Sequence, residues 1–116
     1  MPTALTEVTF GEATAQGLTL VDFWAPWCGP CRVVGPVVDQ LAHEYAGRVT
    51  VAKVNVDDNP SLSAQFRIQG IPALLLLRDG QPVDGMLGAH PKHTIARMLN
   101  RHLAGPAGAP QDQEAT

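Results

Sequence analysis

The chain has 116 residues, a hydrophobic fraction of 45% and a formal net charge of −3, which together predict one small globular domain. A chain of this length buries roughly two-thirds of its unfolded surface, so it can form a core without disulfide staples. The eight basic residues are scattered, so the charge pattern indicates neither nucleic acid nor an anionic membrane as a partner. No apolar run approaches the ~20 residues of a membrane span. The N-terminus lacks a basic start followed by an apolar stretch, so we expect no secretory signal.

The first two-thirds of the chain predicts strands that alternate with helices. The strand preceding the cysteines is continuously apolar, which is typical of burial on both faces. The helix that follows carries apolar residues at helical spacing along one side. In chain order, the expected elements are a short strand at Thr3–Leu5, a weak helix at Thr9–Gln16, a strand at Leu18–Trp24, a helix at Pro30–Tyr45, a strand at Val49–Val56 and a short helix at Ser61–Phe66.

The next part of the chain predicts a β-hairpin. A strand is expected at Ala73–Arg78, which holds four consecutive leucines. Asp79-Gly80 is a strong two-residue turn signal, so the following strand, Val83–Leu87, should run antiparallel to the first. Pro82 at its start is suited to a strand at the edge of a sheet.

The C-terminal part predicts a helix and then a tail. Pro91 opens the last helix, and Gly105-Pro106 ends it. From there to Thr116 the chain has only Gly, Ala, Pro and polar residues, so we expect a domain over residues 1–104 and a disordered tail over 105–116. The whole pattern predicts an α/β fold with a central mixed β-sheet flanked by helices on both faces.

The two cysteines of the chain are framed as Trp27-Cys28-Gly29-Pro30-Cys31. This spacing puts two thiols one turn apart at the start of a helix, where Pro30 suits the first position. The free N–H groups and the helix dipole favour a thiolate at Cys28, and a thiolate is the attacking species in thiol–disulfide exchange. Cys31 can then attack a mixed disulfide formed at Cys28. We expect Cys28 at an exposed helix edge and Cys31 in a more interior position.

A zinc half-site is the alternative interpretation of such a cysteine pair. Zinc needs four ligands, and histidines are the remaining candidates. They lack a second paired spacing near them, so the redox interpretation is favoured and no metal is expected. The candidates are His43, His90, His93 and His102.

The segment from Asp22 to Cys31 resembles the active-site segment of thioredoxins. The resemblance continues to Gly88-Ala89 and covers about residues 3–103, by way of Val51–Asp57, Gly70–Ala73 and Asp79-Gly80. It implies the thioredoxin fold and a protein disulfide reductase, in which Cys28 attacks a substrate disulfide and Cys31 releases the reduced substrate.

Asp22 interrupts an apolar strand, and Leu20 and Trp24 share its face, which indicates burial. A buried carboxylate has a raised pKa and can accept a proton near neutral pH. The resemblance implies that Asp22 serves Cys31 in this way and that Lys53 pairs with Asp22. It further implies a cis peptide bond before Pro72. The implied substrate-docking surface consists of Trp27, Gly29, Pro30, Ile71, Pro72, Leu87, Gly88 and Ala89.

The chain has no Gly-rich dinucleotide fingerprint, so electrons must arrive from another protein. The resemblance implies a thioredoxin reductase fed by NADPH as the donor, and peroxiredoxins, methionine sulfoxide reductases and ribonucleotide reductase as recipients. It implies no cofactor beyond the dithiol, and we expect a cytoplasmic monomer. Two alternatives stay open: a docking or chaperone module without turnover, and an oxidant or isomerase. Gly29-Pro30 brings no charge that would stabilise the Cys28 thiolate further, which favours a reductase.

Overall fold

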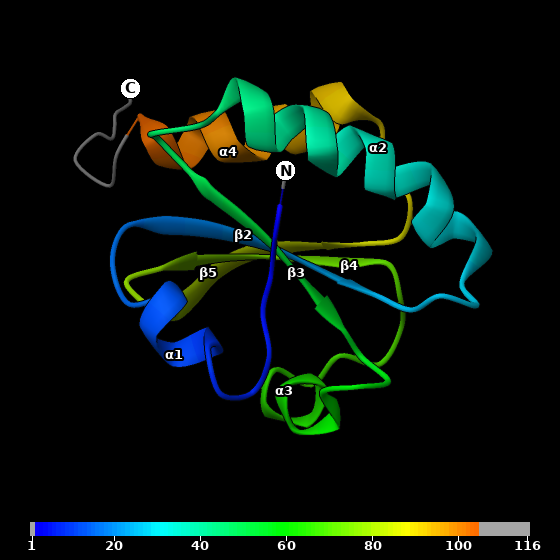
Figure 1. Ribbon diagram of the computed structural model, residues 1–116. Coiled ribbons are helices and arrows are strands. Elements are labelled where there is room, and N and C mark those ends of the chain that lie inside the picture. The colour runs from blue at the N-terminus through cyan, green and yellow to red at the C-terminus, as the bar shows by residue number, and fades with distance from the viewer. Residues whose placement is uncertain (1, 105–116) are drawn as a thin grey trace.

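The computed structural model describes residues 2–104, and Met1 and the predicted tail at 105–116 lie outside the described residues. Five strands and four helices alternate through this part of the chain (Figure 1). In order, they are β1 (Thr3–Ala4), α1 (Phe10–Ala13), β2 (Leu18–Trp24), α2 (Gly29–Glu44), β3 (Thr50–Asn55), α3 (Pro60–Gln65), β4 (Ala73–Arg78), β5 (Gln81–Leu87) and α4 (Lys92–Leu103).

The strands form one mixed sheet in the order β1-β3-β2-β4-β5. β1, β3 and β2 are parallel, whereas β4 runs antiparallel to β2 and to β5. Helices α2 and α4 cover one face, and α1 and α3 lie on the other (Figure 1). The predicted mixed sheet and hairpin are therefore confirmed. Asp79 and Gly80 both have positive φ, 52° and 84°, which is the backbone of a type I′ hairpin turn.

Two elements differ from the sequence prediction by more than one residue at an end. The helix expected at Thr9–Gln16 spans only Phe10–Ala13, because glycine and β-branched threonines give this stretch little helix propensity. β5 begins at Gln81, earlier than expected, and thus includes Pro82. The ladder with β4 has an irregularity opposite Pro82, between Leu76 and Leu77, which accommodates a residue that has no N–H to donate.

The core has two parts because residues along each strand alternate between the faces of the sheet. From β2, Leu18 and Leu20 pack under α2 and α4, and Val21 and Phe23 pack toward α1 and α3. Asp22 follows the alternation of Leu20, so it faces α2 from within the sheet. This confirms the prediction that the strand is buried on both faces.

The cysteines lie where β2 ends and α2 begins. The last residue of β2, Trp24, is opposite Asn55 at the end of parallel β3, and the Val56 N–H donates to the Trp24 carbonyl at 2.9 Å. Parallel strands thus end at one edge, where their following loops meet. Over residues 2–104, no helix is both long and apolar enough to cross a membrane.

Candidate active site

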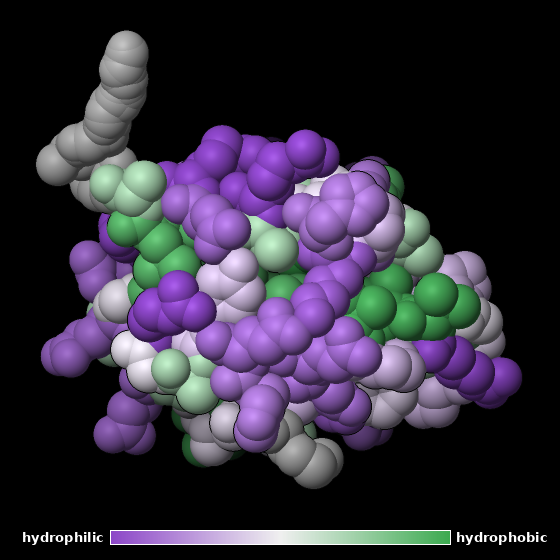
Figure 2. Space-filling view, turned by 90° about the horizontal axis from the view of Figure 1, so that it is seen from above, coloured by the Kyte–Doolittle hydropathy of each residue, from purple (hydrophilic) through white to green (hydrophobic). Residues whose placement is uncertain are grey.

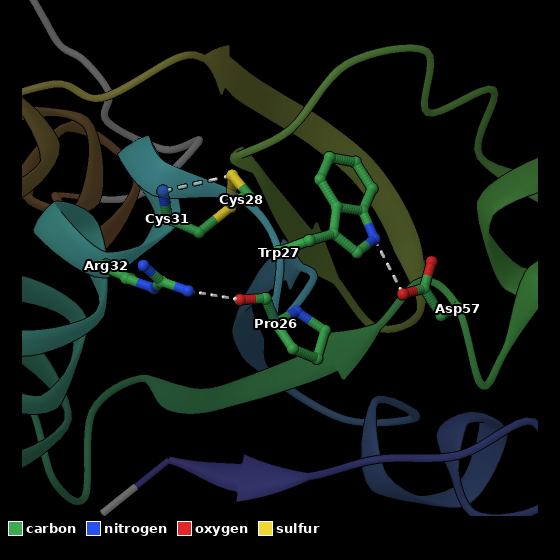
Figure 3. Close-up of a disulfide and its surroundings, with 6 residues drawn as sticks. All are labelled: Pro26, Trp27, Cys28, Cys31, Arg32 and Asp57. Carbon is green, nitrogen blue, oxygen red and sulfur yellow. Dashed lines mark hydrogen bonds between the residues drawn. A yellow bond between two sulfur atoms is a disulfide. The ribbon is translucent and has the colours of Figure 1, made fainter.

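Cys28 and Cys31 form a disulfide, with their Cα atoms 5.3 Å apart. Cys28 is the N-cap of α2, and its Sγ accepts a hydrogen bond of 3.2 Å from the Cys31 N–H (Figure 3). The cap occurs here because the backbone of Cys28 is extended and Pro30 follows in the first turn. A backbone donor at the positive end of a long helix points at the sulfur, so a thiolate at Cys28 would be stabilised after reduction.

Exposure does not distinguish the two thiols in the disulfide form. Cys28 is 4% exposed and Cys31 is 6% exposed, so the expectation of an exposed Cys28 and a more interior Cys31 is wrong. Both pack against Ala25, with Trp24 and Ile71 alongside. The difference between them lies instead in the capping position of Cys28 and in the groups behind Cys31.

Trp27 lies next to the disulfide with 67% of its surface exposed. Its indole Nε1 donates to the Asp57 carboxylate at 2.9 Å, and Arg32 donates to the Pro26 carbonyl at 3.0 Å (Figure 3). These bonds orient the loop before Cys28. Sequence reasoning did not single out Asp57. The parallel pairing of β2 with β3 could have placed it, because Asp57 follows β3 as Trp27 follows β2.

The other predicted docking residues come from two further loops. The Ile71–Pro72 peptide bond is cis, as predicted, and Ile71 packs against the cluster that holds both cysteines. The Gly88 N–H donates to the Pro72 carbonyl at 2.8 Å, which joins the end of β5 to this loop. Leu87 is 66% exposed, and Ala89 is exposed as well.

One cavity lies between two of the predicted docking residues. It has a volume of about 460 Å³, and both Trp27 and Ile71 line it, together with Gly70. On the α2 and α4 side, the surface is largely polar with apolar patches, one of which lies over the beginning of α2 (Figure 2). Of the predicted docking residues, Ile71 thus lies against the cysteines, Trp27 shares a cavity with Ile71, and Gly88 is joined to Pro72.

Asp22 is buried, with 4% of its surface exposed, as its place in the strand predicted. Its register partner in β3 is Lys53, so the two side chains emerge next to each other on one face. Burial raises the pKa of Asp22 to about 6, against the lowering effect of the Lys53 charge and with a further upward effect from Asp39. One carboxylate oxygen, Oδ1, has no hydrogen-bond partner in the described residues.

A second cavity, of about 340 Å³, lies under the beginning of α2, next to the Asp22 side chain. Cys31 is the cysteine that lines it, and Asp22, Lys53 and Asp39 line it as well. The Lys53 Nζ sits 5.0 Å from the centroid of the Trp24 ring, a cation–π arrangement that holds the ammonium in the cavity. The sequence predicted Cys31, Asp22 and Lys53 as site residues and missed Asp39.

Within residues 2–104, no group of three or more His, Cys, Asp or Glu side chains is placed to hold a metal ion. His90 instead bonds the Leu87 carbonyl through Nε2, and His102 bonds the Asp84 carboxylate.

Comparison with known proteins agrees with this fold and this dithiol. The thioredoxin family model matches residues 2–101. Thioredoxin 1 of Synechococcus elongatus is 51% identical over 102 residues, which cover 86% of this chain and 95% of that protein. The thioredoxins of Staphylococcus haemolyticus and Staphylococcus aureus are 44% and 43% identical over 99 residues, covering 85% of this chain and 95% of each relative. The chain belongs to the thioredoxin family and has the thioredoxin fold.

Proposed function

We propose that this chain is a protein disulfide reductase that relays electrons from a reductase to disulfide-containing proteins through Cys28 and Cys31. The observation that carries the proposal is the N-cap of α2, where the Cys28 sulfur accepts the Cys31 N–H. The helix start favours the thiolate, which is the nucleophile of disulfide exchange. Membership of a family of disulfide reductases supports the same conclusion.

The reaction has two exchanges. The Cys28 thiolate attacks one sulfur of a substrate disulfide, and the second substrate sulfur leaves as a thiolate that takes up a proton. Cys31 then loses its proton and attacks the Cys28 sulfur. The mixed disulfide breaks, and the substrate sulfur that was bound to Cys28 leaves and is protonated to the other thiol. Two electrons have passed to the substrate, and the protein is left with the Cys28–Cys31 disulfide.

Asp22 accepts the Cys31 proton in this proposal, directly or through water. Its burial, its pKa of about 6 and its place in the same cavity as Cys31 support the role. A base works best when its pKa lies near the working pH, because it is then largely ionised and still basic enough to take a proton. Lys53 keeps the buried carboxylate from becoming too weak an acid, since its positive charge favours the ionised form.

Substrates bind as extended peptides over the loops that surround the disulfide. The exposed Trp27 and Leu87 side chains offer apolar contact, and main-chain groups of an extended peptide add hydrogen bonds. Such contacts suit many partners because they read little of the sequence. The residues proposed for this surface are Trp27, Gly29, Pro30, Ile71, Pro72, Leu87, Gly88 and Ala89.

Electrons reach the dithiol from a thioredoxin reductase, which draws them from NADPH, and no cofactor is needed on this chain. The recipients proposed are peroxiredoxins, methionine sulfoxide reductases and ribonucleotide reductase. The protein works in the cytoplasm as a monomer. A close pair of reactive thiols without a wider disulfide framework supports this compartment.

The test compares two serine variants in insulin reduction and in the capture of protein disulfides. Cys28→Ser is expected to lose reaction with disulfides altogether. Cys31→Ser should still attack and then stall as a mixed disulfide, which non-reducing electrophoresis detects and mass spectrometry assigns to Cys28. Trapped adducts on Cys31 in the Cys28→Ser protein would reverse the roles assigned to the two cysteines. An insulin reduction rate unchanged from that of the parent chain in either variant would overturn the proposed function.

A further inference from the structure

The cavity behind Cys31 contains a second carboxylate that the proposed mechanism does not use. Asp39 lies on α2 and lines this cavity together with Asp22 and Lys53. Cys31 and Asp39 are eight residues apart on one helix, and residues at this spacing share a face. Asp39 is thus near the edge of the side of α2 that carries Cys31, and its side chain is exposed to solvent as well as lining the cavity.

Gly35 lies midway between these two residues on the helix and also lines the cavity. A Cβ atom built at Gly35 would have no heavy atom within 4 Å, so the space between Cys31 and Asp39 is open. Asp22 reaches the same space from the sheet below, with its Oδ1 unpartnered. No side chain at position 35 screens the two carboxylates from each other.

Lys53 is a cation that lines the cavity together with both carboxylates. Within the described residues the ion pairs are Lys92–Glu44, Arg101–Asp84 and His102–Asp84, so the Lys53 ammonium is not held by either cavity carboxylate. Its fixed contact is the Trp24 ring.

The other groups that face Asp22 are few. From α2 they are Cys31 and Arg32, and the Arg32 guanidinium is already bonded to the Pro26 carbonyl. From the N-terminal segment only Pro2 lines the cavity among the described residues, and it brings no side-chain charge.

We propose that Asp39 is a positioning residue that raises the proton affinity of Asp22, and through it shifts the pH range in which Cys31 can release substrate. The proposal rests on the proposed role of Asp22 as the proton acceptor. A negative charge in the same cavity disfavours the ionised form of Asp22, and burial acts in the same direction. The upward effect of Asp39 on the pKa of Asp22 agrees with this arrangement.

The first measurement is the titration of the Asp22 side chain, followed by carboxyl carbon NMR in the oxidised protein. The disulfide form is chosen because its cysteines do not titrate, so the Asp22 curve is not coupled to a thiol. In Asp39→Asn the Asp22 midpoint should move to lower pH by roughly half a unit. Asp39→Glu keeps the charge and should stay close to the original midpoint. Glu12→Gln, which removes one negative charge from an exposed position on α1, is the matched control and should leave it unchanged.

The second measurement follows the two exchanges of the reduced protein with 5,5′-dithiobis(2-nitrobenzoate). Attack by Cys28 releases the first thionitrobenzoate, and attack by Cys31 on the mixed disulfide releases the second. The second phase slows at acid pH as Asp22 becomes protonated. In Asp39→Asn this acid limb should move to lower pH by the same amount as the Asp22 midpoint.

The outcomes separate this proposal from the proposed function. An Asp22 midpoint that stays in place in Asp39→Asn overturns the role of Asp39, even if Asp22→Asn still slows the second phase and the proposed function stands. A midpoint that moves while the second phase keeps its pH profile overturns both the role of Asp39 and that of Asp22. A common shift in the two measurements, absent in Glu12→Gln, supports the proposal.

Discussion

Asp22 carries a free-energy cost that depends on pH. Its pKa of about 6 in the folded chain lies above the ordinary value of 3.8, so the folded state binds the proton more tightly than the unfolded state. Below pH 4 both states are protonated and the cost is absent. Stability is lost as the pH rises from about 4 to 6, where the unfolded state is ionised and the folded state still holds the proton, and above 6 the whole cost applies.

Asp22→Asn should therefore be more stable than the parent chain at pH 7 to 8 by roughly 2–3 kcal/mol. The gain should shrink between pH 6 and 4 and vanish below pH 4. Urea unfolding at a series of pH values measures it. Release of substrate should slow by about ten-fold or more near neutral pH, because the amide cannot accept the Cys31 proton. Equal stability of both proteins at pH 8, or unchanged turnover from pH 6 to 8, would contradict the account.

The second prediction at the scale of a residue concerns the dipeptide between the cysteines. Pro30→His should make the dithiol more oxidising than the parent chain, because an imidazole next to Cys28 stabilises a thiolate that exists only in the reduced state. A charge-assisted hydrogen bond is worth about 1.5–3 kcal/mol, which corresponds to roughly 30–60 mV for two electrons.

Equilibration against glutathione buffers measures the potential of Pro30→His. Pro30→Ala is the control, since it removes the proline without adding an imidazole. If Pro30→His were as reducing as the parent chain or more so, the electrostatic argument would fail and an oxidant function would need consideration again.

At the scale of elements, the end of β5 is tied to the Pro72 loop through Gly88. Gly88 has a φ of +94° and donates its N–H to the Pro72 carbonyl. A side chain disfavours this backbone conformation, so Gly88→Ala should destabilise the fold by about 1–2 kcal/mol and weaken substrate reduction. Gly11→Ala in α1 should be neutral or stabilising, because its Cβ meets nothing within 4 Å and alanine has the higher helix propensity. Urea unfolding of the two variants tests the difference, and equal stabilities would contradict it.

The elements themselves could largely be predicted because their signals are local. The apolar run of β2, the helix that starts at the cysteines and the Asp79-Gly80 turn are each contained in a few consecutive residues. The beginning of α3 is a counterexample. Its N-cap, Asn59, makes no capping bond, and the Ser61 N–H donates instead to the Glu7 carboxylate at 2.8 Å, a contact across 54 residues that no local pattern indicates.

The same limit applies to the site. The cysteines and Asp22 were predictable from their immediate neighbours in the sequence, and Lys53 followed from a resemblance. Asp57 and Asp39 were not, because their importance depends on what the fold places opposite them. Asp57 bonds an indole 30 residues away, and Asp39 faces a cavity that exists only when α2 lies over the sheet.

For the whole molecule, residues 105–116 are expected to contribute nothing to stability or to reduction. Their composition offers too little apolar surface to offset the entropy lost on ordering them. A chain ending at Ala104 should match the full chain in melting temperature and in insulin reduction, within error. A clear fall in melting temperature on truncation would show that the segment docks on the domain.

The two edges of the sheet bear on how copies of this chain behave when crowded together. An open strand edge can pair with an edge of another copy, which is how many proteins begin to aggregate. Here β1 offers only two residues. The longer edge, β5, is interrupted by Pro82 and by the ladder irregularity beside it. Further along, Asp84 places a carboxylate on that strand, bonded to Arg101 and His102 of α4. Strand addition between copies is thus disfavoured along both edges, while the end of β5 at Leu87, where substrate contact is proposed, stays exposed.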